Sequence, residues 1–474
     1  MSEETTEGKQ EDSKTPSKKA KKSKGKKFKY KSQGNGRGFR FYLKFILLIL
    51  GFITLGFGVY ASLCLFISFG GISNTISTGA SQISGFLIFI YLLAALLIIK
   101  VFPSVYSEFS DREREKPHTN QIEMIKKVIL VFGLILAIVN AFPLATTPLS
   151  VQNAEREFEE AYGPKWDSTI PQNIQRSFMG TQFNLLNYYL GIPQKECNLQ
   201  TDREYYRDEN IYLMFDVYYP KATERELPGG NSTIIKIHGG GWTEGDKGLA
   251  NMIPVNKYLA SQGYIVFDIQ YGLYDHGEDP TLPTPEHVRG NFTLHDMVSH
   301  IGYFTHQLEE NLADEYQSRL DSVFIMGGSA GGHLTAISGL GYNDPYFSGN
   351  FSNAITIKGT VPIYPANDAE RISSGDRKEL IPGTPQSNPL AFEKFTPSNL
   401  ADQNDSAALI YHGLQDGLVD PQESKDIEIA LEDKGVNCIR IEFPFATHAS
   451  DFLVNNNFAQ VWMFYLERFL YLQQ

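Results

Sequence analysis

The feature that most constrains this chain is the 25-residue stretch from Phe45 to Phe69, which contains no charged side chain and is rich in Leu, Ile and Phe. About 20 apolar residues in a helix span the hydrocarbon core of a bilayer. The stretch is too long, and begins too far from the first residue, to be the apolar part of a signal peptide. It therefore predicts a transmembrane helix at about 45–69, with a buried core helix as the alternative.

Two further apolar runs follow the first. Residues 83–102 carry only one charge, at Lys100, and residues 128–147 are apolar except for a late Asn and Pro. We therefore predict a membrane segment over residues 41–147 with three transmembrane helices. No carboxylate or basic side chain lies in the middle of any of them, so a transport pathway has little support.

The distribution of Lys and Arg predicts the orientation of this segment. Residues 1–40 form a Lys-, Ser- and Gly-rich head that has too few apolar side chains to fold, so we expect it to be disordered. The head and the 103–127 loop are basic, whereas the 70–82 loop has no Lys or Arg. The positive-inside rule places the head in the cytosol, and three crossings place everything after about residue 147 in the lumen or outside the cell. A nuclear-localisation signal is the competing interpretation of the Lys run.

The part of the chain after the membrane segment differs in charge. The whole chain carries a net charge of −12, and residues 128–474 carry −22. This acidity argues against nucleic-acid binding. Three cysteines in the whole chain exclude a disulfide scaffold, although Cys197 and Cys438 are candidates for one bond on the oxidising side. Four N-x-Ser/Thr sequons predict a glycoprotein and start at Asn231, Asn291, Asn350 and Asn404.

Residues 205–474 alternate between strand and helix patterns, and we interpret residues 150–204 before them as a juxtamembrane linker. Short β-branched runs such as Thr233 to Ile237 are separated by amphipathic runs such as His295 to Leu312. This alternation predicts an α/β fold with a doubly wound, mostly parallel sheet covered by helices on both faces. The Pro-rich stretch 365–400 is either a cap over a pocket or a surface excursion.

A G-x-S-x-G motif lies between a strand pattern and a helix pattern. The motif is Gly327-Gly328-Ser329-Ala330-Gly331, and the apolar run Val323 to Met326 precedes it. A nucleophile elbow needs this context, because its serine occupies a strained strand-to-helix turn and small flanking residues prevent clashes. Since glycine-rich loops that contain serine are common, the motif alone is weak evidence.

A second glycine-rich sequence, His238-Gly239-Gly240-Gly241-Trp242, follows the strand pattern that ends at Ile237. Backbone N–H groups in such a loop can point at a developing oxyanion, and glycine lets the backbone come close. A flexible turn and a phosphate-binding loop are the alternatives. The sequence lacks the Lys-Ser/Thr of a P-loop, which favours the oxyanion role.

A nucleophilic serine needs a base, and the base needs an orienting acid. Only three histidines follow Ser329, at 333, 412 and 448. His333 is on the helix of the elbow and His412 ends a strand, so both are expected to be structural. His448 lies in a loop after the last strand pattern and is the expected base.

The acid should lie in the loop after the preceding strand pattern. Asp416, in His412-Gly-Leu-Gln-Asp416, fits that place. Asp420 and Asp451 are its rivals. With this choice the order along the chain is Ser, acid, His, which is the order of this architecture.

Together these motifs resemble the α/β-hydrolase superfamily, within it the esterase/lipase group that includes BD-FAE-like and hormone-sensitive-lipase-like proteins. The resemblance covers about residues 205–474. One departure is Tyr271-Gly-Leu, where relatives often have Tyr-Arg-Leu. The resemblance implies a catalytic domain with Ser329 as nucleophile, His448 as base and Asp416 as acid, and an oxyanion hole made by the N–H groups of Gly240, Gly241 and Ala330.

The resemblance also implies the chemistry. We expect a membrane-anchored carboxylic ester hydrolase that forms an acyl-serine, uses no cofactor and acts on a small-molecule or lipid ester. No metal-ligand spacing such as H-E-x-x-H is present, so no metal is expected. The rivals are an amidase, arylformamidase or peptidase with the same triad, and a non-catalytic adhesion or receptor domain. The partners are the ester and the lipid bilayer, and the oligomeric state stays open.

Overall fold

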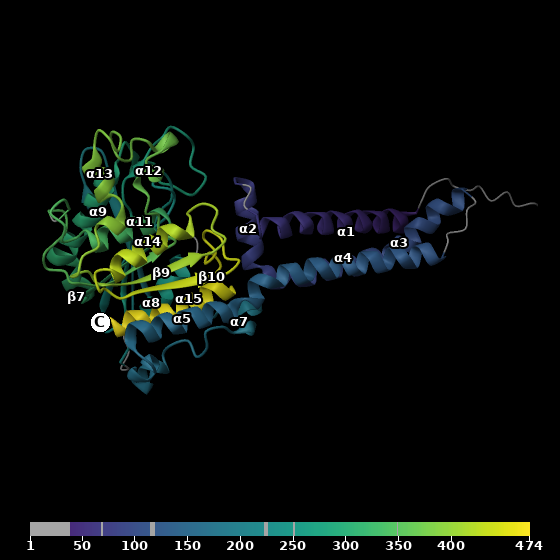
Figure 1. Cartoon of the computed structure of the whole chain (residues 1–474), viewed down its shortest axis with the longest axis horizontal. Coiled ribbons are helices and arrows are strands. Elements are labelled where there is room, and N and C mark those ends of the chain that lie inside the picture. The colour runs from purple at the N-terminus through teal and green to yellow at the C-terminus, as the bar shows by residue number, and fades with distance from the viewer. Residues whose placement is uncertain (1–37, 68–69, 114–118, 222–225, 250–251, 348) are drawn as a thin grey trace, which may run out of the picture.

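The computed structural model has a helical bundle at one end and a larger globular part at the other (Figure 1). The predicted disordered head, residues 1–40, lies almost wholly outside the residues that the structure describes. Those described residues are 38–67, 70–113, 119–221, 226–249, 252–347 and 349–474.

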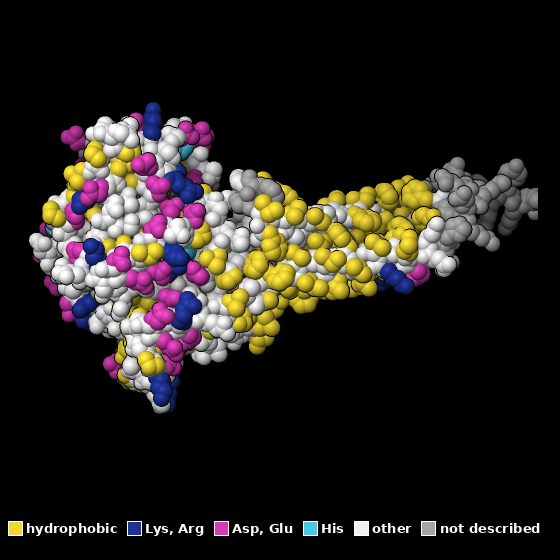
Figure 2. Space-filling model, in the orientation of Figure 1, with side chains coloured by type: hydrophobic (Ala, Val, Ile, Leu, Met, Phe, Trp, Pro, Cys, Tyr) yellow, Lys and Arg dark blue, Asp and Glu magenta, His cyan; other side chains and the backbone are white. Residues whose placement is uncertain are grey.

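The bundle contains helices long and apolar enough, by length and composition, to cross a membrane. They are α1 (Phe39–Cys64), α3 (Ser84–Glu113) and α4 (Thr119–Ala145). A helix the length of α1 is about 39 Å long, which exceeds the bilayer's hydrocarbon core of about 30 Å. Hydrophobic side chains cover the bundle, and charged ones gather at the end farther from the globular part (Figure 2).

Small residues let the three helices pack closely. A Cβ added to Gly133 of α4 would lie 2.5 Å from the Cβ of Ala95 of α3, and one added to Gly51 of α1 would lie 2.6 Å from Ile98. Asn140 donates a hydrogen bond of 2.8 Å to the hydroxyl of Ser62 in α1. Small side chains and one interhelical hydrogen bond are the usual means of holding helices together in lipid.

The connection between α1 and α3, expected as a loop over residues 70–82, contains helix α2 (Ile72–Gln82). This helix lies crosswise to the bundle, between the bundle and the globular part (Figure 1). It buries polar side chains, including Ser77, Ser81 and Gln82, rather than an apolar stripe. Its small polar residues therefore gave no apolar periodicity from which a helix would be predicted.

The globular part is built on an eight-stranded sheet in the order β1-β2-β4-β3-β7-β8-β9-β10. β1 and β2 are antiparallel, as are β2 and β4, and the remaining neighbours are parallel. The mostly parallel sheet agrees with the predicted fold class. The strands are β1 (Asn198–Arg207), β2 (Tyr212–Tyr219), β3 (Ser232–Ile237), β4 (Ile265–Ile269), β7 (Arg319–Gly328), β8 (Ile357–Ile363), β9 (Ala407–Gly413) and β10 (Cys438–Phe443). A separate small pair is β5 (Leu273–Tyr274) and β6 (Arg289–Gly290).

Helices cover both faces of this sheet and bury two apolar cores. One core receives side chains from α5 (Thr147–Tyr162), α8 (Met252–Ser261) and α15 (Asn457–Leu472). The other receives side chains from α9 (Leu294–Gln307), α11 (Ala330–Leu340) and α14 (Pro421–Glu432). The shorter helices are α6 (Gln172–Gln175), α7 (Leu185–Leu190), α10 (Ala313–Tyr316), α12 (Ala369–Ile372) and α13 (Pro389–Lys394).

Residues 150–204, which the sequence suggested as a linker, are part of the globular fold. Phe158 of α5 and Trp166 are buried, and their rings pack 4.6 Å apart against Tyr465 of α15. β1 also begins at Asn198, so the domain starts well before residue 205. The buried apolar side chains of this segment, such as Phe158, Trp166 and Phe178, pack into one core with α8 and α15.

Candidate active site

Ser329 occupies the turn between β7 and α11. Its backbone angles are φ 58° and ψ −121°, a conformation that residues with a Cβ rarely adopt. The turn fits only because its neighbours are glycines: a Cβ on Gly331 would lie 2.3 Å from the carbonyl oxygen of Ile237, and one on Gly327 would lie 2.6 Å from the same atom. The glycines of the local sequence thus allow a sharp turn that exposes the serine side chain at the carboxyl ends of the parallel strands, as the elbow motif predicts.

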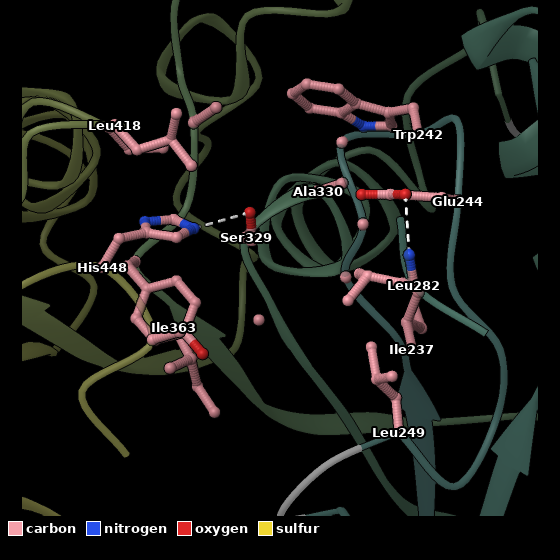
Figure 3. Close-up of a pocket in the computed structure, with 18 of the residues that line it drawn as sticks. Ile237, Trp242, Glu244, Leu249, Leu282, Ser329, Ala330, Ile363, Leu418 and His448 are labelled. Atoms are coloured by element: carbon pink, nitrogen blue, oxygen red, sulfur yellow. Dashed lines mark hydrogen bonds between the residues drawn. The ribbon is translucent and has the colours of Figure 1, made fainter. Parts of the chain in front are cut away.

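The structure brings together the three side chains that the sequence singled out. The imidazole Nε2 of His448, in the loop after β10, lies 2.9 Å from the Ser329 Oγ (Figure 3). Its Nδ1 lies 2.7 Å from an oxygen of Asp416, in the loop after β9. Each residue follows the carboxyl end of a different parallel strand, which is why residues far apart in the chain meet at one edge of the sheet.

Asp416 is oriented and kept ionised by its surroundings. One carboxylate oxygen accepts hydrogen bonds from the N–H groups of Leu418 (2.8 Å) and Val419 (2.9 Å). The other faces His448 and lies 3.4 Å from the Nε2 of His412. Burial by itself opposes ionisation, but the two imidazoles outweigh it and hold the pKa of Asp416 well below its usual range.

The remaining candidates have other partners. The Nε2 of His333 lies 3.0 Å from the carbonyl oxygen of Phe395, and burial lowers the pKa of His333 to about 4. Asp420 caps α14 by accepting a hydrogen bond from the N–H of Gln422. Asp451 accepts one of 2.9 Å from the hydroxyl of Tyr364. His412, expected to be only structural, lies beside Asp416 and supports it.

The glycine-rich loop after β3 lies against the elbow. A Cβ on Gly239 would be 2.7 Å from the carbonyl oxygen of Gly328. Gly240 has a φ of 125°, and a Cβ there would overlap the carbonyl of Glu244. The backbone N–H groups of Gly240, Gly241 and Ala330 donate to no acceptor within the described part of the chain. Free N–H groups beside a serine hydroxyl are suited to receive an oxyanion.

A cavity of about 460 Å³ opens above Ser329. Apolar side chains surround the serine hydroxyl, with Trp242 opposite His448 (Figure 3). The Pro-rich stretch 365–400 supplies one wall through Ala366, Ile372 and Arg377. Among the described residues, no group of three or more His, Cys, Asp or Glu side chains is placed to hold a metal ion. The lining is largely apolar but includes charged side chains such as Arg377 and Glu244, so the site is suited to a group with an apolar part.

Two polar residues of α2, outside the globular part, form hydrogen bonds with the His448 loop, and no sequence motif marked them. Thr78 of α2 donates a hydrogen bond of 3.1 Å to the carbonyl oxygen of His448, and Thr447 donates one of 2.9 Å to Thr78. The Gln82 amide donates to the carbonyl of Ala449 at 3.3 Å. Gln82 also accepts hydrogen bonds from the N–H of Leu453 and the side chain of Asn456. The helix between the first two apolar helices thus holds the loop that carries His448.

The sequons and cysteines fall at different depths. Asn291 and Asn404 are exposed, whereas the side-chain nitrogen of Asn350, the atom that a glycan modifies, is buried. Cys197 and Cys438 are both free. The structure therefore has no disulfide bond between them.

Comparisons with known proteins found a matching family model and several relatives. Residues 215–431 match the BD-FAE family. The chain is 27% identical to the "Probable carboxylic ester hydrolase LipM" of Mycobacterium tuberculosis over 49% of this chain and 52% of LipM, so it spans about half the length of that relative. It is 28% identical to the esterase LipQ of the same organism, over 62% of this chain and 68% of LipQ. The match and these relatives support the resemblance of the globular part to the esterase/lipase group of α/β-hydrolases.

Solved structures include a similar chain. The crystal structure of esterase B from Lactobacillus rhamnosis is 17% identical, covers 65% of this chain and 90% of its own, and superposes with a TM-score of 0.43.

Proposed function

We propose, from the resemblance of the globular part to esterases and lipases, that this chain is a membrane-anchored serine hydrolase that cleaves a carboxylic ester. The observation that carries the proposal is the continuous hydrogen-bonded series from Ser329 through His448 to Asp416, at the floor of an apolar cavity. A serine becomes a nucleophile when a base accepts its proton and an acid orients that base.

In the acylation step, the Ser329 Oγ attacks the ester carbonyl while its proton passes to the Nε2 of His448. The ionised Asp416 then stabilises the imidazolium and keeps its Nδ1–H directed at the carboxylate. The bond to the alcohol oxygen breaks as the imidazolium returns the proton to that oxygen. The acyl group is left on Ser329, and the alcohol leaves.

The negative charge that develops on the carbonyl oxygen needs fixed donors. In this proposal the N–H groups of Gly240, Gly241 and Ala330 supply them, because the loop and the elbow adjoin each other. Fixed donors next to the reacting carbonyl favour the charged intermediate over the neutral ester. Water then attacks the acyl-serine with His448 again as base, which yields the carboxylic acid and free enzyme without a cofactor.

The contacts of α2 support the proposed topology. Since α2 joins the first two apolar helices and binds the His448 loop, the connection between them lies on the same side as the globular part. With the basic head in the cytosol and three crossings, that side is the lumen or the exterior. The enzyme would then meet esters outside the cytosol.

A fluorophosphonate probe applied to membranes that contain the full chain tests the proposal, because it labels only an activated serine. We expect labelling of the wild type and none of Ser329→Ala. A series of p-nitrophenyl esters with increasing acyl length, run beside the matching anilides, then separates an esterase from an amidase. Labelling that persists in Ser329→Ala would contradict the proposed nucleophile.

A further inference from the structure

The edge of the sheet that carries the candidate site faces the apolar bundle. The carboxyl ends of β9 and β10 point toward the bundle, with α2 between them (Figure 1). Phe445, three residues before His448, packs against Phe66 at 5.3 Å and against Phe142 at 5.7 Å between ring centroids. Phe66 follows α1 and Phe142 is in the last turn of α4, so the loop of the base rests on the outer ends of two predicted spans.

The mouth of the cavity carries exposed apolar side chains. Leu418, next to the loop of Asp416, is 57% exposed, and Phe452, next to the loop of His448, is 50% exposed. Both also line the cavity. The charged Arg371 at this rim is paired with Glu423 at 2.9 Å. Single exposed apolar residues are ordinary, but a pair that continues the wall of an apolar cavity marks a surface for an apolar partner.

A short helix beside the bundle, α7, also carries exposed apolar side chains. The hydroxyl of Tyr188 in α7 accepts a hydrogen bond of 2.8 Å from the N–H of Gly85, at the start of α3, and donates one of 3.0 Å to the carbonyl of Gln82. These bonds fix α7 at the outer end of the bundle. Its Leu185, Leu186 and Leu190 are nevertheless exposed, Leu190 by 82%. Exposed leucines at the outer end of the bundle are suited to the boundary between the headgroups and acyl chains of a bilayer.

We infer that the cavity opens onto the outer leaflet of the membrane and that the substrate comes from this leaflet. The substrate is then a membrane lipid with a carboxylic ester, and its acyl chain enters the cavity first. This inference rests on the proposed function and names its substrate class. The acyl chain passes from the leaflet across Leu418 and Phe452 into the cavity without crossing water, which removes the cost of hydrating it. The acyl group moves from the lipid alcohol oxygen to the Ser329 Oγ, water releases it as a fatty acid, and the alcohol stays in the leaflet.

The first test compares two substrates on the full chain reconstituted in phosphatidylcholine vesicles. One is water-soluble p-nitrophenyl butyrate, and the other is a fluorogenic long-chain acyl glycerol ester incorporated in the bilayer. The double variant Leu418→Ser, Phe452→Ser should lower the ratio of lipid-ester to butyrate kcat/KM at least fivefold. Ile429→Ser, an exposed apolar residue on α14, is the matched control and should leave the ratio unchanged.

The outcomes separate the two proposals. If butyrate hydrolysis depends on Ser329 but the wild type ignores the lipid ester, or the double variant keeps the ratio, the inference is overturned and the proposed function stands. If no ester is hydrolysed in a Ser329-dependent way, the proposed function itself fails.

A second test needs no activity. In a Cys197→Ser background, Leu190→Cys and Ile429→Cys are each labelled with an environment-sensitive fluorophore and mixed into vesicles of brominated phosphatidylcholine. Bromine should quench the label at 190 at least twofold more than the label at 429. Equal quenching at the two positions would show that α7 lies outside the bilayer and would overturn the inference.

Discussion

The side-chain hydroxyl of Thr78 donates a hydrogen bond of 3.1 Å to the backbone carbonyl of His448, although the two residues are 370 positions apart. Thr78 lies between two apolar helices, and His448 is the expected base. Gln82, one turn later in α2, holds the same loop at Ala449 and Leu453. The segment of apolar helices therefore contributes, through α2, to the position of the imidazole.

Loss of these hydrogen bonds should slow the chemistry more than it weakens binding. A small displacement of a catalytic group costs a large factor in rate, so we expect Thr78→Val and Gln82→Leu each to lower kcat by roughly tenfold with little change in KM. Thr78→Ser keeps the hydroxyl and should restore kcat. Thr75→Val, on the exposed side of the same helix, is the control and should behave as wild type. Equal losses in the Thr75 and Thr78 variants would mean that α2 acts only through overall stability.

Ser329→Ala should abolish hydrolysis of a short p-nitrophenyl ester. Members of such a catalytic unit are strongly interdependent, so the loss in kcat should be about 10³-fold or more. Thermal unfolding of the detergent-solubilised chain should be nearly unchanged, because the serine side chain bonds only to His448 among the described residues. A variant with near wild-type turnover would assign the nucleophile elsewhere.

Asp416 and Asp420 lie in the same loop region and provide a matched test of which aspartate orients His448. Asp416→Asn should reduce kcat by about 10³–10⁴-fold, because the amide favours the wrong tautomer of His448. Asp420→Asn should keep kcat, since asparagine caps a helix as well as aspartate does and Asp420 only caps α14. Steady-state kinetics of both variants decide the assignment, and the reverse pattern would move the acid to Asp420.

On the acid side, the dependence of kcat/KM on pH should reflect the loss of one proton. A general base must be unprotonated to accept the serine proton, so activity on the acid side of the profile rises with pH. The pKa of Asp416 lies well below its usual range, so this carboxylate is already ionised and adds no second step. We therefore expect log kcat/KM to rise with a slope of one. A slope of two would show that a second group must also lose a proton.

The topology is tested on a chain that carries an epitope tag at each end. Sealed, cytosol-side-out vesicles that contain this chain are treated with protease. Protease should remove the N-terminal tag and spare the C-terminal one.

Glycosylation gives a second test of the topology. In a host that glycosylates, Asn291→Gln and Asn404→Gln should each remove one glycan, whereas Asn350→Gln should not, because the side-chain nitrogen of Asn350 is buried. In the protease experiment, loss of both tags before detergent is added would place the globular part in the cytosol.

The sequence alone predicted the features whose signals are local. The uncharged run from Phe45 to Phe69 lies over α1, which begins earlier, at Phe39. The run Thr233 to Ile237 lies in β3, and the run Val323 to Met326 lies in β7, as predicted. The order of Ser329, Asp416 and His448 could be used because each follows a recognisable strand pattern, and parallel strands bring their carboxyl ends to one edge.

Tertiary structure alone decided what those elements contact. Strand β1 was missed because its exposed edge lacks regular alternation. Residues 150–204 were interpreted as a linker because their apolar side chains complete a core only together with distant elements such as α15. Thr78 and Gln82 carry no motif, and their partners lie hundreds of residues later. Hydrophobic periodicity reports which side of one element is buried, whereas a hydrogen bond between distant elements leaves no pattern along the chain and exists only once both have folded against each other.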